Sequence, residues 1–158
     1  MTLGPLVNEK QFERVQSYIR KGMEEGAELL TGGLGRPEGL EGGYYTKPTV
    51  FVNVRSDMTI AREEIFGPVL SVIVYKNLDE AIEIANDTDY GLQSYITTSN
   101  PEKAQMVARR LQTGRVLINS PAHDPQVPFG GFKQSGLGRE FGVLGLESFL
   151  EAKSILGK

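Results

Sequence analysis

The chain has 158 residues, with 17 Lys and Arg against 20 Asp and Glu, which gives a formal net charge of −3. Its sequence pI near 5.3 leaves no basic excess to neutralise phosphates, so nucleic acid is excluded as an expected partner. No apolar run approaches the roughly 20 residues that a spanning helix needs, and residues 1–5 lack the basic and apolar regions of a signal peptide. We therefore expect a cytoplasmic protein with no membrane partner.

The chain contains no cysteine and a single histidine, His123. Disulfides, thiolate metal sites and a cysteine nucleophile are therefore excluded within these residues, and one histidine cannot form a multi-histidine metal site. We expect no bound metal and an exposed loop position for His123. The length suits one domain with its own core.

The first half of the chain predicts one helix and several strands. Asn8 followed by Gln11 resembles a capping box, and apolar residues then recur at helical spacing, which predicts a helix from about Gln11 to Glu25. β-Branched and aromatic runs predict a strand over residues 44–54, in which Pro48 indicates an edge or a break. Short apolar runs also predict a buried strand at 27–30 and a central strand at 69–75.

The middle of the chain alternates helices and strands. Asn100 and Pro101 form an N-cap with proline at the first helical position, and Gly114 marks the expected end of that helix. The other elements expected here are a short helix ending near residues 86–87 and strands at 92–98 and 115–119. This alternation predicts an α/β fold with parallel strand pairing.

Residues 120–138 are rich in proline and glycine and show no periodicity, which is typical of a functional or disordered loop. Phe129 and Phe132 favour order, because aromatic side chains need a surface to pack against. A last helix is predicted over residues 139–147 and a terminal strand over residues 149–156.

Adjacent carboxylates at Glu63 and Glu64 precede a Gly-Pro turn and could serve acid/base chemistry. Neighbouring side chains usually point apart, so a solvated surface charge is the competing and favoured interpretation for one of them. The pattern of charges alone leaves both interpretations open.

Two glycine-rich stretches suggest phosphate loops. The stretch at residues 32–35 is not followed by a helix N-terminus that could direct its amides at an anion. Gly130 and Gly131, with Lys133 and Arg139 nearby, could bind an anion, but a loop that crosses close to other backbone is the favoured interpretation.

Seven segments in order carry a resemblance to a known family: GPLVNEKQFERVQSYI, GGYYTKPTVF, REEIFGPVLSV, EIANDTDYGLQSYITTS, GRVLINS, PFGGFKQSGLGREFG and GLESFLEAKS. The chain resembles the C-terminal portion of the NAD(P)-dependent aldehyde dehydrogenase superfamily from Gly4 to Leu156. The resemblance implies an α/β fold: the later part of the catalytic domain, including the aldehyde-pocket loop, over residues 1–138, and a C-terminal helix with an oligomerisation strand over residues 139–158.

The resemblance also implies roles for individual residues. Glu64 would accept hydrogen bonds from the nicotinamide ribose, and Phe66 would lie near the nicotinamide ring. Phe129 would line the aldehyde pocket, and Asn119 would form the rim of that substrate pocket together with residues 120–127. Arg139 and Glu151 would form an ion pair at a subunit interface of a homo-oligomer, with two independent surface charges as the alternative.

The family reaction implies NAD or NADP as cofactor, an aldehyde substrate, a cysteine nucleophile and a glutamate base. These 158 residues contain no cysteine and neither the family's base motif nor its glycine-bearing cofactor segment, so no catalytic residue is assigned. We expect the chain alone to be inactive and to bind NAD weakly or not at all. The alternative is a stand-alone, non-catalytic remnant that acts as an oligomerisation or partner-binding module.

Overall fold

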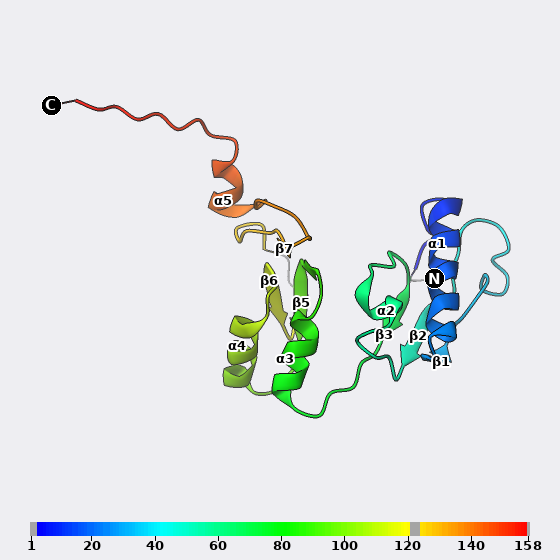
Figure 1. Ribbon diagram of the computed structural model, residues 1–158. Helices are drawn as coiled ribbons and strands as arrows, with labels where there is room; N and C mark the ends of the chain where they lie inside the picture. Colours follow the sequence, from blue (N-terminus) through cyan, green and yellow to red (C-terminus); the bar gives the residue numbers. More distant parts are fainter. Residues whose placement is uncertain (1–2, 121–123, 158) are drawn as a thin grey trace. The chain divides into compact units, whose positions relative to one another are not determined.

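A computed structural model describes residues 3–120 and 124–157. It divides the chain into two compact units, residues 1–77 and 78–158, rather than the single domain expected from length (Figure 1). The boundary expected after Gly138 therefore falls inside the second unit, and the assignment of functional domains on either side of it stays a prediction. His123 lies outside the described residues.

The first unit begins with helix α1 (Glu9–Glu24), close to the predicted range. The Asn8 side chain accepts a hydrogen bond from the Gln11 backbone N–H at 2.9 Å, which confirms the N-cap. Val15 and Ile19 of α1 pack on Phe51, and all three are fully buried. This apolar stripe joins the helix to the sheet.

The sheet of the first unit has the order β1-β2-β3, so β2 is its central strand. β1 (Glu28–Thr31) pairs antiparallel with β2 (Thr49–Val52), which pairs parallel with β3 (Val69–Ser71). The short helix α2 (Thr59–Arg62) follows β2 and brings Ile60 into the core.

Several expectations for these strands are wrong. β1 is exposed along its whole length, because only Ala27 before it reaches the core. β2 is confined to four residues after Pro48, which has no N–H to donate. The run at 69–75 forms an edge strand of three residues rather than a central one, since Val74 and Tyr75 find no partner strand among the described residues.

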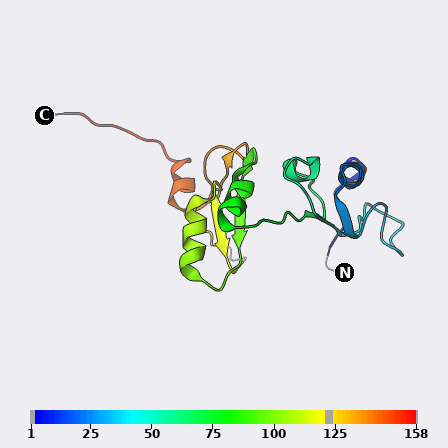
Figure 2. The same cartoon turned by 60° about the horizontal axis from the view of Figure 1, so that its bottom comes forward.

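The described residues of the second unit form two strand pairs and three helices (Figure 2). β5 (Gln93–Ile96) and β6 (Arg115–Ile118) form a parallel pair, which confirms the parallel pairing expected there, and β4 (Tyr90–Gly91) pairs antiparallel with β7 (Phe132–Lys133). The helices are α3 (Leu78–Asn86), α4 (Pro101–Arg110) and α5 (Gly142–Glu147).

Helices α3 and α4 are joined by their polar ends. The Arg110 guanidinium lies 2.6 Å from the Asp79 carboxylate, and the Asn86 amide donates to the Arg110 carbonyl at 2.9 Å. Asn100 caps α4 by accepting from the Lys103 N–H, as predicted, but the helix ends at Arg110 instead of reaching Gly114.

No strand forms over the described residues 149–157, so the terminal strand predicted over residues 149–156 is wrong for these residues. A strand needs a partner to satisfy its backbone groups, and these residues lie exposed and pair with no strand in the described part of the chain. Among the described helices, none is long and apolar enough to cross a membrane.

Candidate functional site

The site residues predicted from the sequence fall into two groups, one in each unit. Glu64 and Phe66 lie in the turn between α2 and β3 of the first unit. Asn119, Phe129, Arg139 and Glu151 lie in the second unit. We describe each group within its own unit.

The turn in the first unit consists of residues 63–68 and lies directly against α1. Ile65 is buried in the core, whereas Phe66 is 71% exposed. A Cβ atom at Gly67 would lie 2.5 Å from Cγ2 of Val15, so only glycine allows this approach to the helix. Ile65 and Gly67 therefore fix the turn against the core and α1, while the Phe66 side chain between them is exposed.

The two adjacent carboxylates of this turn have different environments. The Tyr18 hydroxyl donates to Oε2 of Glu63 at 2.6 Å, which ties that carboxylate to α1. The Glu64 side chain is exposed, and within the described residues its carboxylate has no hydrogen bond or ion pair. Glu64 is therefore the carboxylate that remains available to accept hydrogen bonds from a ligand.

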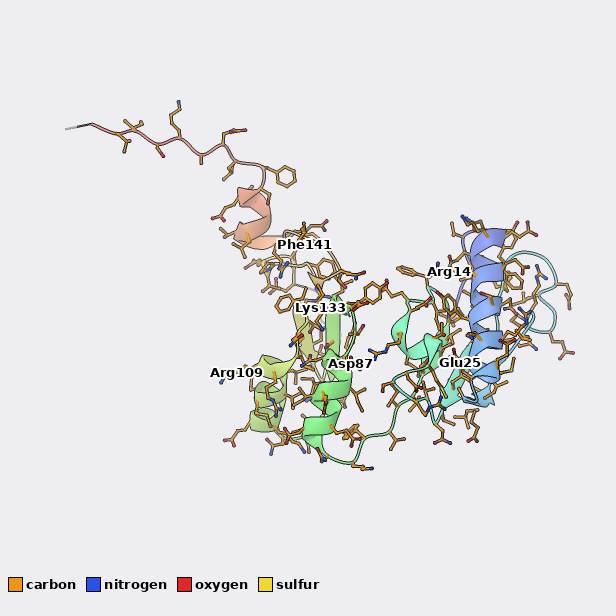
Figure 3. The ribbon with its side chains drawn as sticks, in the orientation of Figure 1. Arg14, Glu25, Asp87, Arg109, Lys133 and Phe141 are labelled. Carbon is orange, nitrogen blue, oxygen red and sulfur yellow. The ribbon has the colours of Figure 1, made fainter. Side chains whose placement is uncertain are left out.

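Phe66 has a left-handed backbone, with φ of +55°. This region costs a non-glycine residue about 1–2 kcal/mol, so the surrounding contacts must hold it there. The Arg14 guanidinium donates to the Glu64 carbonyl at 2.9 Å, and the Gln11 amide donates to the carbonyls of Ile65 and Phe66 at 3.1 and 2.8 Å. These donors come from α1 (Figure 3, where Arg14 is labelled).

Asn119 follows β6 and is also left-handed, with φ of +57°. Its side-chain oxygen accepts from the Thr98 N–H at 2.9 Å, and its side-chain nitrogen donates to the Thr98 carbonyl at 2.8 Å. The amide therefore joins the ends of β5 and β6 as a strand partner would. Its polar atoms are used in this structural role, while its exposed position next to residue 120 is compatible with a pocket rim.

Phe129 lies in the loop that follows. Its backbone forms a two-way bridge with Glu140, with N···O distances of 2.8 and 2.7 Å, and the Arg115 guanidinium lies 5.0 Å from the centre of its ring. A cavity of about 370 Å³ opens beside it, lined by Leu92, by Phe129–Gly131, by Ser135–Glu140 and by Ser148. Phe129 thus lines a cavity of the second unit.

The glycines of this loop permit close crossings of backbone, which confirms the favoured interpretation of Gly130 and Gly131. A Cβ at Gly114 would lie 1.6 Å from the Gly130 carbonyl oxygen, and one at Gly130 would lie 2.6 Å from that of Gly138. The Lys133 ammonium donates to the carbonyls of Asn86 and Thr88 at 2.6 and 2.9 Å. That cation is used to hold the loop (Figure 3).

Arg139 binds backbone carbonyls of its own loop. Its guanidinium donates to the carbonyls of Gly131 and Gly138 at 3.0 and 2.6 Å, and it lies 5.6 Å from the centre of the Phe132 ring. Glu151 is exposed, and no ion pair joins it to Arg139 within the described part of this chain. Their pairing across a subunit interface stays a prediction.

Sequence reasoning missed the donors that hold these loops. The capping-box pattern accounts for the backbone of Gln11, but the Gln11 side chain reaches carbonyls 54 and 55 residues away. The available signal was helical spacing, because Gln11, Arg14 and Tyr18 fall on one face of α1. Lys133 carried no comparable signal.

The turn of the first unit brings together two groups that could contact a ligand. The Glu64 carboxylate can accept hydrogen bonds from hydroxyl groups, and the exposed Phe66 ring, two residues later, can pack against a flat ring. Among the described residues no group of three or more His, Asp and Glu could hold a metal ion.

Comparison with known proteins identifies relatives of the whole chain. A family model described as "Aldehyde dehydrogenase family" matches residues 1–155. Curated relatives that carry aldehyde dehydrogenase names occur in Staphylococcus haemolyticus, at 61% identity, and Staphylococcus aureus, at 59% identity, each over 155 residues, or 98% of this chain and 33% of the relative. The chain therefore spans about a third of the length of the curated relatives it matches.

Solved structures agree with this match. A mutant of aldehyde dehydrogenase C (AldC) from Pseudomonas syringae, complexed with NAD+ and octanal, is 54% identical, with a TM-score of 0.96 over 98% of this chain and 32% of that one. An aldehyde dehydrogenase of Mycobacterium tuberculosis complexed with NAD+ is 52% identical, with a TM-score of 0.91 over 93% of this chain and 30% of that one. The α/β fold corresponds to part of the catalytic domain.

Proposed function

The chain belongs to the aldehyde dehydrogenase family, and from that membership we propose that it supplies the C-terminal part of an enzyme that oxidises an aldehyde to a carboxylic acid with NAD(P)+. The observation that carries the proposal is the turn at residues 63–68, which presents the unpartnered carboxylate of Glu64 beside the exposed Phe66. The Pseudomonas syringae and Mycobacterium tuberculosis relatives were solved with NAD+, which supports NAD as the cofactor.

When bound, NAD(P)+ would supply the hydride acceptor for this function. Glu64 accepts hydrogen bonds from the hydroxyls of the nicotinamide ribose, and two such bonds fix the ribose better than one. Phe66 restricts the nicotinamide ring to the orientation in which transfer occurs. Neither residue exchanges a proton with the substrate.

The second unit contributes the substrate side of the proposal. Phe129 offers its half-buried ring to the aldehyde, and Asn119 fixes the start of the segment at residues 120–127 that forms the rim. Because the Asn119 amide is already bound to Thr98, we assign it a positional role at the rim.

The chain contains no cysteine, so the nucleophile and the base must come from the portion of the family that these residues do not span. The isolated chain is accordingly inactive and holds NAD+ weakly. Cytoplasmic location and a homo-oligomer complete the proposal. As a second candidate, the exposed apolar side chains of Phe149, Leu150, Ile155 and Leu156 favour a non-catalytic role in self-association or partner binding.

A chimera tests the main proposal. In the Pseudomonas syringae enzyme with its native cysteine, which the solved mutant replaces by alanine, the aligned C-terminal segment is replaced by this chain, and NADH formation from octanal is followed by absorbance. We expect the chimera to be active and the isolated chain to be inactive. The substitution Glu64→Gln is expected to raise KM for NAD+ by about tenfold or more, because hydrogen bonds to a charged group contribute about 1.5–3 kcal/mol.

The neighbouring substitution Glu63→Gln is the matched control, since a glutamine oxygen still accepts from Tyr18. It is expected to leave KM for NAD+ within about twofold of the parent chimera, inside the usual spread of surface substitutions. Equal effects of the two substitutions would contradict the assignment of Glu64. NADH formation by the isolated chain would contradict the proposal that the nucleophile and the base lie in the portion of the enzyme that this chain does not span.

A further inference from the structure

We propose that Gln11, Arg14 and Tyr18 form a clamp on α1 whose role is to position the turn at residues 63–68 and to decide which of its two carboxylates meets the cofactor. The inference deepens the proposed function and rests on it for the role of Glu64 and Phe66. The three residues are spaced i, i+3 and i+7, so they lie along one face of the helix. None of them is assigned a contact with substrate or cofactor; they act through the turn.

The first observation is that three consecutive backbone carbonyls of the turn accept from this face. The Glu64 carbonyl binds Arg14, and the carbonyls of Ile65 and Phe66 bind the single amide nitrogen of Gln11. These residues lie outside any strand or helix, so their carbonyls have no ladder partners. The clamp therefore supplies hydrogen-bond donors to three consecutive carbonyls that have no partner in a helix or strand.

The second observation is the orientation that these bonds impose. The Ile65 carbonyl belongs to the peptide plane before Phe66, and the Phe66 carbonyl belongs to the plane after it. By holding both planes, the Gln11 amide restrains φ and ψ of Phe66 at the same time, and φ is the unfavourable +55°. Burial of Ile65 anchors the turn at one point but does not prevent a peptide plane from rotating.

The third observation separates the two carboxylates. The Arg14 guanidinium donates to the Tyr18 hydroxyl at 3.0 Å and lies 5.1 Å from the centre of its ring. The Tyr18 hydroxyl donates onward to Glu63 at 2.6 Å. Donation from a cation strengthens the hydroxyl as a donor, so this chain of bonds retains Glu63 on the helix and leaves Glu64 unpartnered.

The test uses the full 158-residue chain and requires no cofactor. Gln11→Glu keeps the size of the side chain and favours the helix N-terminus, but an ionised carboxylate cannot donate to the two carbonyls. Glu13→Gln is the matched control, because it replaces glutamate by glutamine, the reverse of the test substitution, at an exposed position of the same helix. The φ of Phe66 is followed by NMR through the coupling between its amide and Cα protons.

Gln11→Glu is expected to abolish the left-handed signature of Phe66 and to speed amide hydrogen exchange over residues 63–69 by about two- to tenfold per hydrogen bond lost. Glu13→Gln is expected to change neither measurement. Tyr18→Phe removes one hydroxyl and is expected to shift the side-chain resonances of Glu63 while leaving α1 helical. A Gln11→Glu chain that keeps both the Phe66 signature and the wild-type exchange rates overturns the clamp.

The active chimera then separates this inference from the proposed function. If the clamp positions the cofactor turn, Gln11→Glu raises KM for NAD+ by several-fold while KM for octanal stays within twofold. If Gln11→Glu displaces the turn by NMR but neither it nor Glu64→Gln changes KM for NAD+, the clamp stands and the cofactor role of the turn fails. If Glu64→Gln raises KM but Gln11→Glu leaves the turn in place, the cofactor role stands and the clamp fails.

Discussion

Replacing Gly67 by alanine tests how closely the turn at residues 63–68 lies on α1. The added Cβ would lie 2.5 Å from Cγ2 of Val15, closer than real Cβ contacts come, and 3.0 Å from Cγ1 of Val15, which is also a tight contact. Val15 is fully buried and β-branched in a helix, so it cannot rotate away. Gly67 is not among the residues with positive φ, which leaves this contact as the obstacle.

The expected cost is that of overpacking a core, about 1–3 kcal/mol of the free energy of unfolding. For a unit of this size each kcal/mol lowers Tm by about 4–8 °C, so Gly67→Ala is expected to lower the melting point of the first unit by roughly 4–24 °C. The turn carries Phe66 with it, and relief of the clash moves that residue away from the Gln11 amide.

Thermal unfolding by circular dichroism measures the effect, and hydrogen exchange of α1 and β2 assigns it to the first unit. Gly42→Ala is the control, because a Cβ there meets nothing within 4 Å and the backbone is not left-handed. That substitution is expected to be neutral or to stabilise by up to about 1 kcal/mol through the unfolded chain. Equal melting points for the two variants would refute the close approach of the turn to Val15.

Two further outcomes follow from the described contacts. The Thr59 hydroxyl and the Thr59 backbone N–H both donate to the Glu25 carboxylate, and these bonds hold the pKa of Glu25 below its ordinary value. The contribution of this contact to the free energy of unfolding is therefore complete above the unfolded-state pKa and is lost as the pH falls through the lowered pKa. In denaturant titrations at a series of pH values, Glu25→Gln is expected to weaken the dependence of the free energy of unfolding on pH in the acid range. Phe149 and Leu156 are 88% and 95% exposed, so replacing both by lysine is expected to reduce self-association in sedimentation, and an unchanged mass distribution would exclude this segment as the contact.

Signals between near neighbours were read correctly from the sequence. The side chains of Asn8 and Asn100 each accept from a backbone N–H three residues later. Pro101 fits the first position of α4 because an N–H at that position would have no partner within the helix. Gln11 shows the limit of such reasoning, because its backbone obeys the capping pattern while its side chain serves a turn that is distant in sequence. Spacing indicates which face a residue occupies, but the group it meets depends on the tertiary fold.

Strand predictions failed where a partner strand was required. Residues 69–75 and 149–156 have the composition of strands, yet the first forms a short edge strand and the second forms none. Strand formation depends on hydrogen bonds to a second segment, which the local sequence does not report. In the candidate site, the family motif predicts Glu64 as a binding residue. The motif does not predict that the Tyr18 hydroxyl binds the Glu63 carboxylate, and this contact is what distinguishes Glu63 from Glu64.

The two units differ in how their functional loops are held. The first has a continuous apolar core beneath its turn, whereas the buried apolar side chains described in the second are Ile82, Ala104 and Val107. Its parallel pair β5–β6 is only partly covered, although parallel strands are normally buried on both faces. On the proposed function, the rest of the enzyme supplies that cover. In the chain by itself, Lys133 and Arg139 donate to backbone carbonyls and so hold the loop that contains Phe129. The conformation of this loop therefore depends on hydrogen bonds more than on an apolar core.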